Sequence, residues 1–449
     1  MTEFDGKKIA VVGFGREGQA LAAYFYANHI KADYFDQKEA AFSGSEVLGR
    51  TIVGPLNPAD LSPYDLIYRS PGFSPNNPIF CAIKGNLTSL TELFMTLWPG
   101  RLVGVTGTKG KGTTASLIAA IAHAANKKVM LVGNIGYVDL VSVGEYDADS
   151  IAIMEMSSFQ LMNLGRSPKI AVVLDISSDH LDYHADIDEY ISAKMEIINH
   201  QSPDDWAVVT AMNPRLTIIK KSIKAQMLLA GTAKSLKTNG VWWVDDKLMS
   251  RNGTDIVDIL AAKDVTIGGV HNKINIAAAC AAALCLDIPA TSIRKAVKDF
   301  KGLPQRLETI ASCHGVTFIN DSASTNPVTA IAALEAMQSP TIMLVGGRNK
   351  GLDFGKLADA IINCKYLSKL IAYGESGPEI AEILDQRNFH QYEMVTGFFT
   401  AMQQALAIAA KGDTILLSPA AASFDEFNNS VDRGKKFNQS VHEYCHRKF

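Results

Sequence analysis

The sequence predicts an α/β protein with several mostly parallel sheets, each covered by helices on both faces. Short apolar runs of strand length alternate with amphipathic helical patterns along almost the whole chain. Its 449 residues are more than one hydrophobic core usually organises. Glycine-rich turns at residues 13–18 and 107–112 each separate an apolar strand from a helical pattern, which is typical of nucleotide-binding sheets.

The expected strands are apolar runs at residues 9–12, 66–68, 102–105, 129–132, 151–154, 171–174, 207–209, 342–345, 370–372 and 415–417. Helical patterns cover residues 115–122, 186–200, 274–288 and 291–300. Residues 241–249 differ, because two apolar runs flank a pair of aspartates, and this predicts a β-hairpin at a sheet edge. Pattern changes near residues 91–101 and 301–304 predict three domains, at residues 1–95, 96–301 and 302–449.

Composition excludes several classes of protein. The net charge of −3 gives no basic excess for nucleic acid, and no apolar run is long enough to span a membrane. We expect no secretory signal at the polar N-terminus. The six cysteines are scattered without a Cys-x-x-Cys pair, which favours a reduced cytoplasmic protein over a disulfide framework or a zinc site. They are Cys81, Cys280, Cys285, Cys313, Cys364 and Cys445.

The second glycine-rich turn is the most informative segment. Backbone N–H groups in such a turn, together with the helix that follows, attract phosphate, and Lys111 can reach the outer phosphates. Val105 stands where the common phosphate-loop motif has glycine. We interpret the turn as an ATP-phosphate cradle, with a turn that serves packing alone as the alternative. Its residues are Gly107, Thr108, Lys109, Gly110, Lys111, Gly112 and Thr113.

The first turn has the G-x-G-x-x-G spacing of a dinucleotide-binding fingerprint. Its glycines are Gly13, Gly15 and Gly18, and Asp36 ends the next predicted strand. This indicates a nucleotide site, for which an NAD-dependent dehydrogenase is the natural rival. A tight turn that serves packing alone is the other alternative.

Polar residues follow the next strands of the central segment. Glu155 closes one strand beside the phosphate loop, where nucleotide enzymes hold Mg²⁺, although a solvated strand end would look the same. His180 lies among acids after the following strand, and a structural role is as reasonable as a ligand role. Lys194 falls on the apolar stripe of the helix at 186–200. It either extends its ammonium to water or is a desolvated amine that can act as a nucleophile.

The last third carries three strand-end loops rich in small polar residues and charge. Asp321 ends one strand, and Thr325 and Asn326 open a helix after it. The other loops cover residues 346–351 and 418–427. Lys350 is either a ligand for a carboxylate or phosphate, or a plain surface lysine.

Taken in order, these segments resemble the Mur ligases of peptidoglycan precursor synthesis over essentially the whole chain. The motifs that carry the resemblance are Gly-Thr-Lys-Gly-Lys at 107–111, Glu-Met-Ser-Ser-Phe-Gln-Leu at 155–161, Asp-His-Leu-Asp-Tyr-His at 179–184 followed by Lys194, His271-Asn272-x-x-Asn275, Leu-Pro-x-Arg306, Asn-Asp321-Ser, and Ser-Pro-Ala-Ala-Ala-Ser-Phe-Asp-x-Phe at 418–427.

The resemblance implies a Rossmann-like UDP-binding domain, a central ATPase domain and a Rossmann-like C-terminal domain that binds the amino acid. It implies ATP and two Mg²⁺ as cofactors and a monomer that acts on UDP-N-acetylmuramoyl-L-alanine and glutamate. The implied reaction passes through an acyl phosphate that the glutamate amine attacks. D-Glutamate is expected, and alternatives are an L-glutamate-adding variant or a folylpolyglutamate-synthase-like ligase.

Site residues carried over by the resemblance fall into four groups. Catalytic residues are Lys111, Glu155, His180 and Lys194, and the metal ligands are Thr113, Glu155, His180 and a carbamylated Lys194. ATP contacts are the phosphate loop with Asn272, Asn275, Arg306 and Asp321. UDP-sugar contacts are Arg16, Glu17, Asp36, Gln37, Ser70, Gly72, Asn134, Ser157 and Gln160. Glutamate contacts are Thr325, Lys350 and Ser423.

Three positions depart from the family pattern. Gly112 replaces the usual Mg²⁺-binding hydroxyl residue after the lysine, so Thr113 is expected to supply it. Ala323 replaces a common lysine, and Ser430 stands where an aromatic residue often closes the glutamate pocket. The second phosphate loop argues against a dehydrogenase, and the third set of strand-end loops argues against a simple nucleotide switch.

Overall fold

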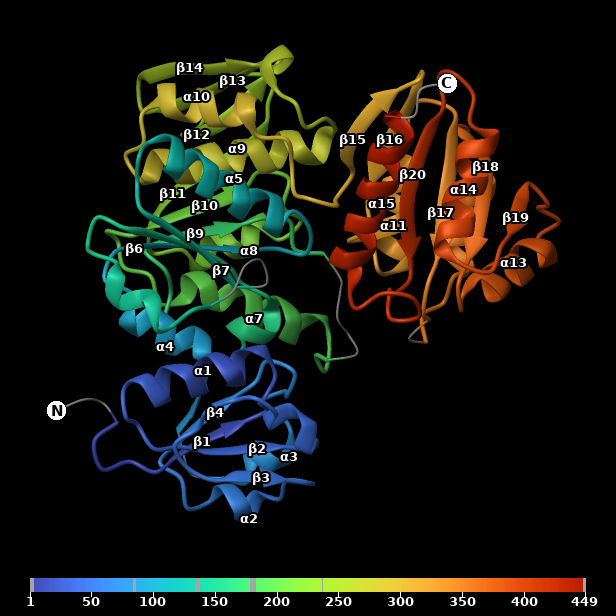
Figure 1. Ribbon diagram of the computed structural model, residues 1–449. Coiled ribbons are helices and arrows are strands. Elements are labelled where there is room, and N and C mark those ends of the chain that lie inside the picture. The colour runs from blue at the N-terminus through green and yellow to red at the C-terminus, as the bar shows by residue number, and fades with distance from the viewer. Residues whose placement is uncertain are drawn as a thin grey trace. The chain divides into compact units, whose positions relative to one another are not determined.

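Three β-sheets organise the chain in a computed structural model that describes residues 4–83, 86–133, 138–177, 183–235, 237–349 and 351–446 (Figure 1). Two sheets belong to a compact unit at Met1–Phe300, and the third belongs to a second unit at Lys301–Phe449. The helices between consecutive strands lie against the sheets, as parallel pairing requires. The predicted α/β fold class with three sheet-containing parts is confirmed.

The N-terminal sheet has the strand order β3-β2-β1-β4-β5 and is parallel throughout. Helix α1 packs on one face through Leu21 and Phe25, while α2 and α3 cover the other. The bounds are β1 Ile9–Val12, α1 Arg16–Ala27, β2 Asp33–Asp36, β3 Thr51–Val53, α2 Pro58–Leu61, β4 Leu66–Arg69, α3 Pro78–Cys81 and β5 Asn86–Thr88.

The central sheet has the order β14-β13-β12-β11-β10-β9-β6-β8-β7. Helices α5, α9 and α10 cover one face and α7 covers the other. The strands are β6 Arg101–Thr106, β7 Val129–Gly133, β8 Ile151–Glu155, β9 Ile170–Val173, β10 Trp206–Thr210, β11 Gln226–Thr232, β12 Gly240–Val244, β13 Lys247–Asn252 and β14 Asp255–Ala261. The helices are α4 Leu90–Leu97, α5 Lys111–Ala124, α6 Ser158–Leu161, α7 Ile187–Asn199, α8 Leu216–Ser222, α9 Val270–Cys285 and α10 Ala290–Asp299.

One hydrophobic core joins the N-terminal and central sheets. Phe25 of α1, Phe94 of α4 and Ile198 of α7 belong to the same buried cluster. Because this core is continuous, the two sheets fall in one compact unit. The predicted boundaries between domains stay a prediction.

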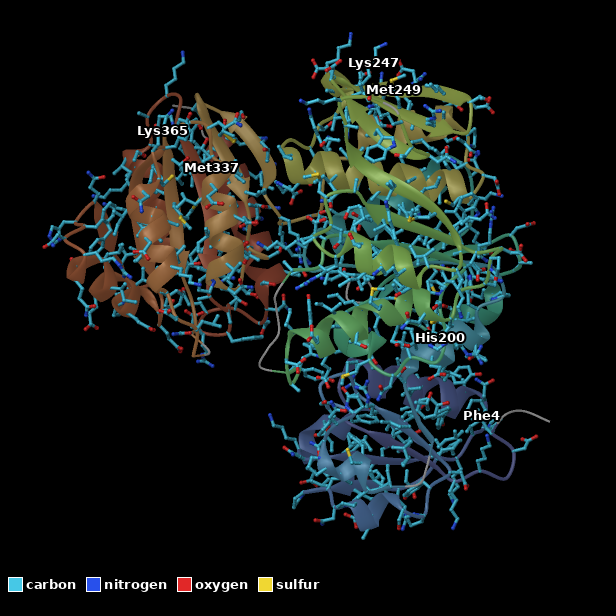
Figure 2. All side chains as sticks on the ribbon, turned by 180° about the vertical axis from the view of Figure 1, so that it is seen from behind. Phe4, His200, Lys247, Met249, Met337 and Lys365 are labelled. Atoms are coloured by element: carbon cyan, nitrogen blue, oxygen red, sulfur yellow. A yellow bond between two sulfur atoms is a disulfide. The ribbon has the colours of Figure 1, made fainter. Side chains whose placement is uncertain are left out.

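The predicted hairpin at 241–249 is confirmed as the antiparallel pair β12 and β13. The sheet continues beyond it with β14, which the sequence analysis did not predict. Lys247 of β13 forms an ion pair with Asp258 of β14 at 3.0 Å, and Figure 2 marks Lys247 and Met249 on this outer part of the sheet. A charged side chain on a strand near the sheet edge discourages pairing with other chains.

The C-terminal sheet has the order β15-β16-β20-β17-β18-β19, and only its β15–β16 pair is antiparallel. Helices α11, α12 and α13 pack on one face, and α14 and α15 pack on the other. The bounds are β15 Glu308–Cys313, β16 Val316–Asn320, α11 Pro327–Glu335, β17 Thr341–Gly346, α12 Gly355–Asn363, β18 Leu367–Tyr373, α13 Gly377–Gln386, β19 Tyr392–Met394, α14 Phe398–Ile408, β20 Thr414–Ala420 and α15 Ser430–Cys445.

The expectation of uniformly reduced cysteines is wrong for one pair. Cys313, at the end of β15, and Cys445, at the end of α15, form a disulfide across 132 residues of sequence. Their separation hides the pair from sequence reasoning, and only the packing of α15 against β15 brings the two sulfurs together. Within the described residues, no helix is long and apolar enough to cross a membrane.

Candidate functional site

The phosphate loop connects β6 to α5 and packs closely against α9. Gly107 and Gly110 have φ values of +150° and +84°, which favour glycine. A Cβ atom on Gly110 would lie 2.3 Å from Oδ1 of Asn275. Nδ2 of Asn275 donates to Oδ1 of Asn272 at 3.3 Å, so the structure brings these two predicted ATP contacts to the loop.

Two lysines converge on one carbonyl oxygen of this loop. Nζ of Lys111 donates to the Gly107 and Thr108 oxygens at 3.1 Å each, and Nζ of Lys194 donates to the Gly107 oxygen at 2.9 Å. Lys194 is 2% exposed and lies 4.7 Å from the centre of the Tyr190 ring. The alternative in which Lys194 reaches water is therefore wrong. Two ammonium groups on one acceptor repel each other, and a nearby anion would relieve that repulsion.

Thr108, Thr113 and Thr114 have different surroundings. The Thr108 hydroxyl lies 2.9 Å from the Tyr190 hydroxyl and accepts from the Ser177 N–H at 2.9 Å. Thr113, in the first turn of α5, is partly exposed. Thr114 is fully buried, and its hydroxyl has no hydrogen-bond partner among the described residues. Thr113 is therefore the hydroxyl that a ligand can reach.

Glu155 lies at the carboxyl end of β8, directly beside the strand that leads into the phosphate loop. It pairs in register with Val105 of β6, and its side chain is buried. The described residues contain no cluster of three His, Cys, Asp or Glu that could hold a metal. Mg²⁺ usually takes one or two carboxylates and completes its shell with water and substrate phosphates. The oxygen donors of Glu155 and Thr113 fit this requirement. His180 lies outside the described residues.

The first glycine turn lies at the carboxyl edge of the N-terminal sheet. A Cβ on Gly13 would lie 2.7 Å from Cβ of Ser70, and a Cβ on Gly18 would lie 2.3 Å from the Gly13 oxygen. Asp36 accepts from the N–H of Phe14 at 2.8 Å, so its carboxylate holds the turn. Of the other predicted UDP-sugar contacts, Arg16, Gln37 and Gly72 are exposed near this edge, and Asn134 lies outside the described residues.

Glu17 joins this edge to the central sheet. Its Oε1 accepts from Nε2 of Gln160 at 3.0 Å, and Gln160 forms a capping box with Ser157 at the start of α6. The structure thus brings together three predicted UDP-sugar contacts from two sheets. Burial raises the pKa of Glu17, which Gln160 and Arg69 partly offset.

Arg69, which the sequence analysis missed, binds the two sheets of the first unit together. Its guanidinium donates to the oxygens of Phe73 at 2.8 Å, Phe159 at 3.1 Å and Met162 at 3.2 Å. Burial lowers the pKa of Arg69. The available signal was its position directly after the apolar run at 66–68, at the ligand-facing end of a parallel strand.

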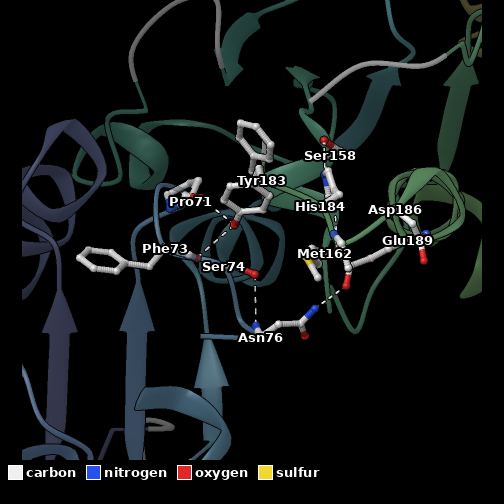
Figure 3. A network of polar contacts seen from close by, with 12 residues as sticks. Pro71, Phe73, Ser74, Asn76, Ser158, Met162, Tyr183, His184, Asp186 and Glu189 are labelled. Atoms are coloured by element: carbon white, nitrogen blue, oxygen red, sulfur yellow. Dashed lines mark hydrogen bonds and ion pairs between the residues drawn. The ribbon is translucent and has the colours of Figure 1, made fainter. Parts of the chain in front are cut away.

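A second network surrounds His184, between the same two sheets (Figure 3). Nε2 of His184 lies 2.9 Å from the Ser158 hydroxyl, and Nδ1 lies 3.4 Å from Oε2 of Glu189. The other Glu189 oxygen accepts from the Asn76 amide, and the Tyr183 hydroxyl donates to the Pro71 oxygen at 2.9 Å. His184 and Ser158 are buried and Asn76 is exposed, so this group links a buried contact to the loop at 71–76.

Predicted site residues in the second unit cluster after β16 and β20. Asp321 is 4% exposed and accepts from the Ser418 hydroxyl at 2.7 Å and the Leu307 N–H at 3.1 Å. Desolvation raises the pKa of Asp321 to about 6. Ser423 is buried after β20, Thr325 precedes α11, and Arg306 is exposed. Lys350 lies outside the described residues.

Comparison with known proteins gives a consistent result. Residues 105–283 match the Mur ligase middle domain, and residues 305–421 match the Mur ligase glutamate ligase domain. The chain is 32% identical to the UDP-N-acetylmuramoylalanine--D-glutamate ligase of Symbiobacterium thermophilum, over 97% of this chain and 98% of that protein. It is 33% identical to the protein of the same name from Desulfitobacterium hafniense, over 98% of each chain.

Solved structures share the fold. The UDP-N-acetylmuramate-alanine ligase MurC of Thermotoga maritima matches with a TM-score of 0.59 and 16% identity, over 98% of this chain and 100% of that chain. The MurF ligase of Thermotoga maritima, solved in complex with ADP, matches with a TM-score of 0.55 and 16% identity, over 99% of this chain and 100% of that one.

Gly110→Ala should lower the affinity for ATP about tenfold or more, because the new Cβ must displace Asn275 and the residue loses its left-handed conformation. Calorimetric titration with ATP and Mg²⁺ measures the effect. Gly144→Ala is the matched control, since a Cβ there meets no atom within 4 Å. Equal affinities for the two variants would contradict the tight packing of this loop.

Asp321→Asn should change how stability depends on pH. The folded-state pKa of Asp321 is raised from 3.8 to about 6, so the folded protein binds this proton more tightly than the unfolded chain. The stabilisation that this protonation gives is complete below pH 4 and is lost as pH rises through 6. Relative to the parent protein, the variant should gain on the order of 3 kcal/mol of unfolding free energy between pH 4 and pH 7. Hydrogen exchange of the β16 and β20 amides measures this difference, and a difference independent of pH would refute the shift.

Proposed function

The chain belongs to the Mur ligase family, and we propose that it adds D-glutamate to UDP-N-acetylmuramoyl-L-alanine in an ATP-dependent reaction. The observation that carries this proposal is the match, over nearly the full length of both chains, to relatives named for that reaction. The phosphate loop and the polar strand ends of all three sheets agree with it. The proposal also includes that the protein acts as a monomer and in the cytoplasm.

The proposed reaction has two steps. The γ-phosphoryl group of ATP passes to the carboxylate of the L-alanyl substrate, which gives an acyl phosphate and ADP. The amine of glutamate then attacks the acyl carbon, the tetrahedral intermediate expels phosphate, and the amine loses a proton. In the first step the protein forms no covalent bond with the substrates, so its main contributions are positioning them and stabilising charge.

In this proposal the phosphate loop holds ATP. The N-terminus of α5 and the ammonium of Lys111 stabilise the charge that develops on the transferring phosphoryl group. Asn272 and Asn275 lie beside the loop, where the family holds adenine, and Arg306 and Asp321 of the second unit are the proposed ribose contacts. The Thr108 hydroxyl stabilises the loop through its hydrogen bonds with Ser177 and Tyr190.

The proposed metal ligands are Thr113, Glu155, His180 and a carbamylated Lys194, with two Mg²⁺ in the loaded enzyme. Mg²⁺ supplies charge neutralisation at the phosphates when it is bound. The buried Lys194 shares an acceptor with Lys111, so its positive charge is unfavourable there. Loss of a proton would give the neutral amine, and addition of CO₂ with release of a second proton would replace that cation with a carbamate, whose carboxylate is the type of ligand that Mg²⁺ prefers.

The UDP-sugar would bind at the first glycine turn and at the start of α6. The guanidinium of Arg16 would pair with the diphosphate. Hydrogen bonds already join Glu17, Ser157 and Gln160 into one group across the two sheets. The remaining proposed contacts are Asp36, Gln37, Ser70, Gly72 and Asn134. Glutamate would bind in the second unit through Thr325, Lys350 and Ser423.

Phosphate release with ATP, UDP-N-acetylmuramoyl-L-alanine and each glutamate enantiomer tests the function. We expect turnover with D-glutamate, and Lys111→Ala should lose about 100-fold or more of it, because a charge stabiliser is gone. Turnover with L-glutamate alone would revise the assigned substrate but would leave the assignment as an ATP-dependent ligase unchanged. No glutamate-dependent phosphate release, or undiminished turnover by Lys111→Ala, would reject the assignment.

Thr113→Val should raise the Mg²⁺ concentration needed for half-maximal activity about tenfold, because it removes the proposed hydroxyl ligand beside Gly112. Thr114→Val is the matched control. The buried Thr114 hydroxyl has no partner among the described residues, so its loss should leave the Mg²⁺ requirement unchanged. Equal responses of the two variants would mean that Thr113 does not bind the metal.

A further inference from the structure

Arg433, on α15, is the largest of the fully buried side chains, with 0% of its surface exposed. Nε of its guanidinium donates to the Ser322 hydroxyl at 3.1 Å, and Nη2 donates to the Ser322 oxygen at 3.2 Å and the Ala421 oxygen at 3.1 Å. Nη1 reaches the oxygens of Ala422 at 3.4 Å and Gly346 at 3.5 Å. One planar cation therefore joins three separate stretches of backbone.

Those three stretches leave the carboxyl ends of adjacent strands. Ser322 follows β16, Gly346 ends β17, and Ala421 and Ala422 follow β20, which lies between the other two in the sheet. After β17 the chain adds β18 and β19 on one side of that strand, and it then returns to form β20 on the other side. The direction in which strands are added therefore reverses beside this point. Such reversals are where open α/β sheets bind their ligands.

The same stretches carry the residues proposed for glutamate. Thr325 follows Ser322 by three positions, and Ser423 directly follows Ala422. The Gly346 loop leads to Lys350, which lies outside the described residues. The position of each loop is therefore tied to the Arg433 guanidinium, although Arg433 is too deeply buried to contact a substrate itself.

The groups that accept hydrogen bonds from the Arg433 guanidinium are backbone oxygens and the Ser322 hydroxyl. No carboxylate among the described residues contacts it. None of the ion pairs among the described residues includes it, and Glu426 interacts with it electrostatically without forming an ion pair. In a medium of low dielectric constant a buried cation keeps a long-range field. The field extends over loops that, in the proposed function, receive a dicarboxylate.

The start of α15 is fixed so that Arg433 cannot easily move away. The Ser322 hydroxyl donates to the Ser430 oxygen at 2.8 Å, and Nε2 of Gln305 donates to the Val431 oxygen at 3.0 Å. A Cβ on Gly434 would lie 2.2 Å from Cδ of Gln305, so α15 approaches this segment as closely as a glycine allows.

We propose that Arg433 is a positioning residue for the amino-acid substrate, which sets the three loops and adds a fixed positive charge beneath them. This rests on the proposed function, because it assumes that these loops bind glutamate. A purely structural role would lower stability without selecting one substrate. A positioning role predicts a defect confined to glutamate.

Steady-state kinetics of Arg433→Met and Arg433→Lys, with each substrate varied in turn, tests the proposal. We expect Arg433→Met to raise KM for glutamate about 10- to 100-fold, with KM for ATP and for the UDP-sugar changed less than about twofold. Arg433→Lys should fall between, because it keeps the charge and loses the planar fork of donors. Lys435→Met, an exposed change on the same helix, is the matched control.

Chemical rescue makes the test independent of folding yield. Arg433→Ala should recover affinity for glutamate when millimolar guanidinium is added, and methylammonium should not replace it, because only a planar donor can reach several carbonyls. A parallel rise in KM for all three substrates, an unchanged KM for glutamate in Arg433→Lys, or equal rescue by methylammonium would overturn the proposal. Failure of the parent protein to use glutamate would instead reject the proposed function.

Discussion

Buried or half-buried cations that donate to backbone carbonyl oxygens hold the carboxyl edge of each of the three sheets. Arg69 does this at the N-terminal sheet, Lys111 and Lys194 at the central sheet, and Arg433 at the C-terminal sheet. The carboxyl ends of parallel strands leave carbonyl oxygens without a strand partner, and buried oxygens of this kind need a donor. An arginine or lysine satisfies several of them at once.

This arrangement places cations at the same sheet edges as the carboxylates of Glu155 and Asp321, in a protein that has a net negative charge. The chain carries −3 overall, yet its ligand-facing edges combine buried cations with helix N-termini. Nucleotide phosphates and the carboxylates of an amino acid are all anions. In the proposed function, one structural solution would therefore serve both stability, by satisfying backbone oxygens, and binding, by setting the local potential.

Within the first unit, the same interactions couple two edges. Arg69 donates to the oxygens of Phe159 in α6 and of Met162 at its end, while Gln160 of α6 donates to Glu17. Two residues separate α6 from Glu155, which neighbours the phosphate loop. Hydrogen bonds and a short stretch of chain thus connect the proposed UDP-sugar site to the strand end that bears the proposed metal ligand.

The sequence by itself determined the α/β fold class, most of the central strands, the hairpin at 241–249 and the two glycine turns. Those features depend on local periodicity and on glycine positions such as Gly110, whose left-handed conformation favours glycine. It also located Glu155 and Asp321, because strand ends are visible as the ends of apolar runs. The burial of Lys194 followed from its place on an apolar stripe, but sequence alone left its path to water open.

Tertiary structure alone decided which distant groups meet. Arg433 bonds Ser322 across 111 positions, Arg69 bonds Phe159 across 90, and Cys313 pairs with Cys445 across 132. Arg433 and the two cysteines have no local pattern that distinguishes them from a surface arginine or isolated cysteines, and the position of Arg69 after an apolar run does not show which oxygens it meets. Strand order likewise placed β20 between β16 and β17. The reason is physical: periodicity records which face of an element is buried, whereas the partner of a buried polar group is fixed only when sheets and helices pack.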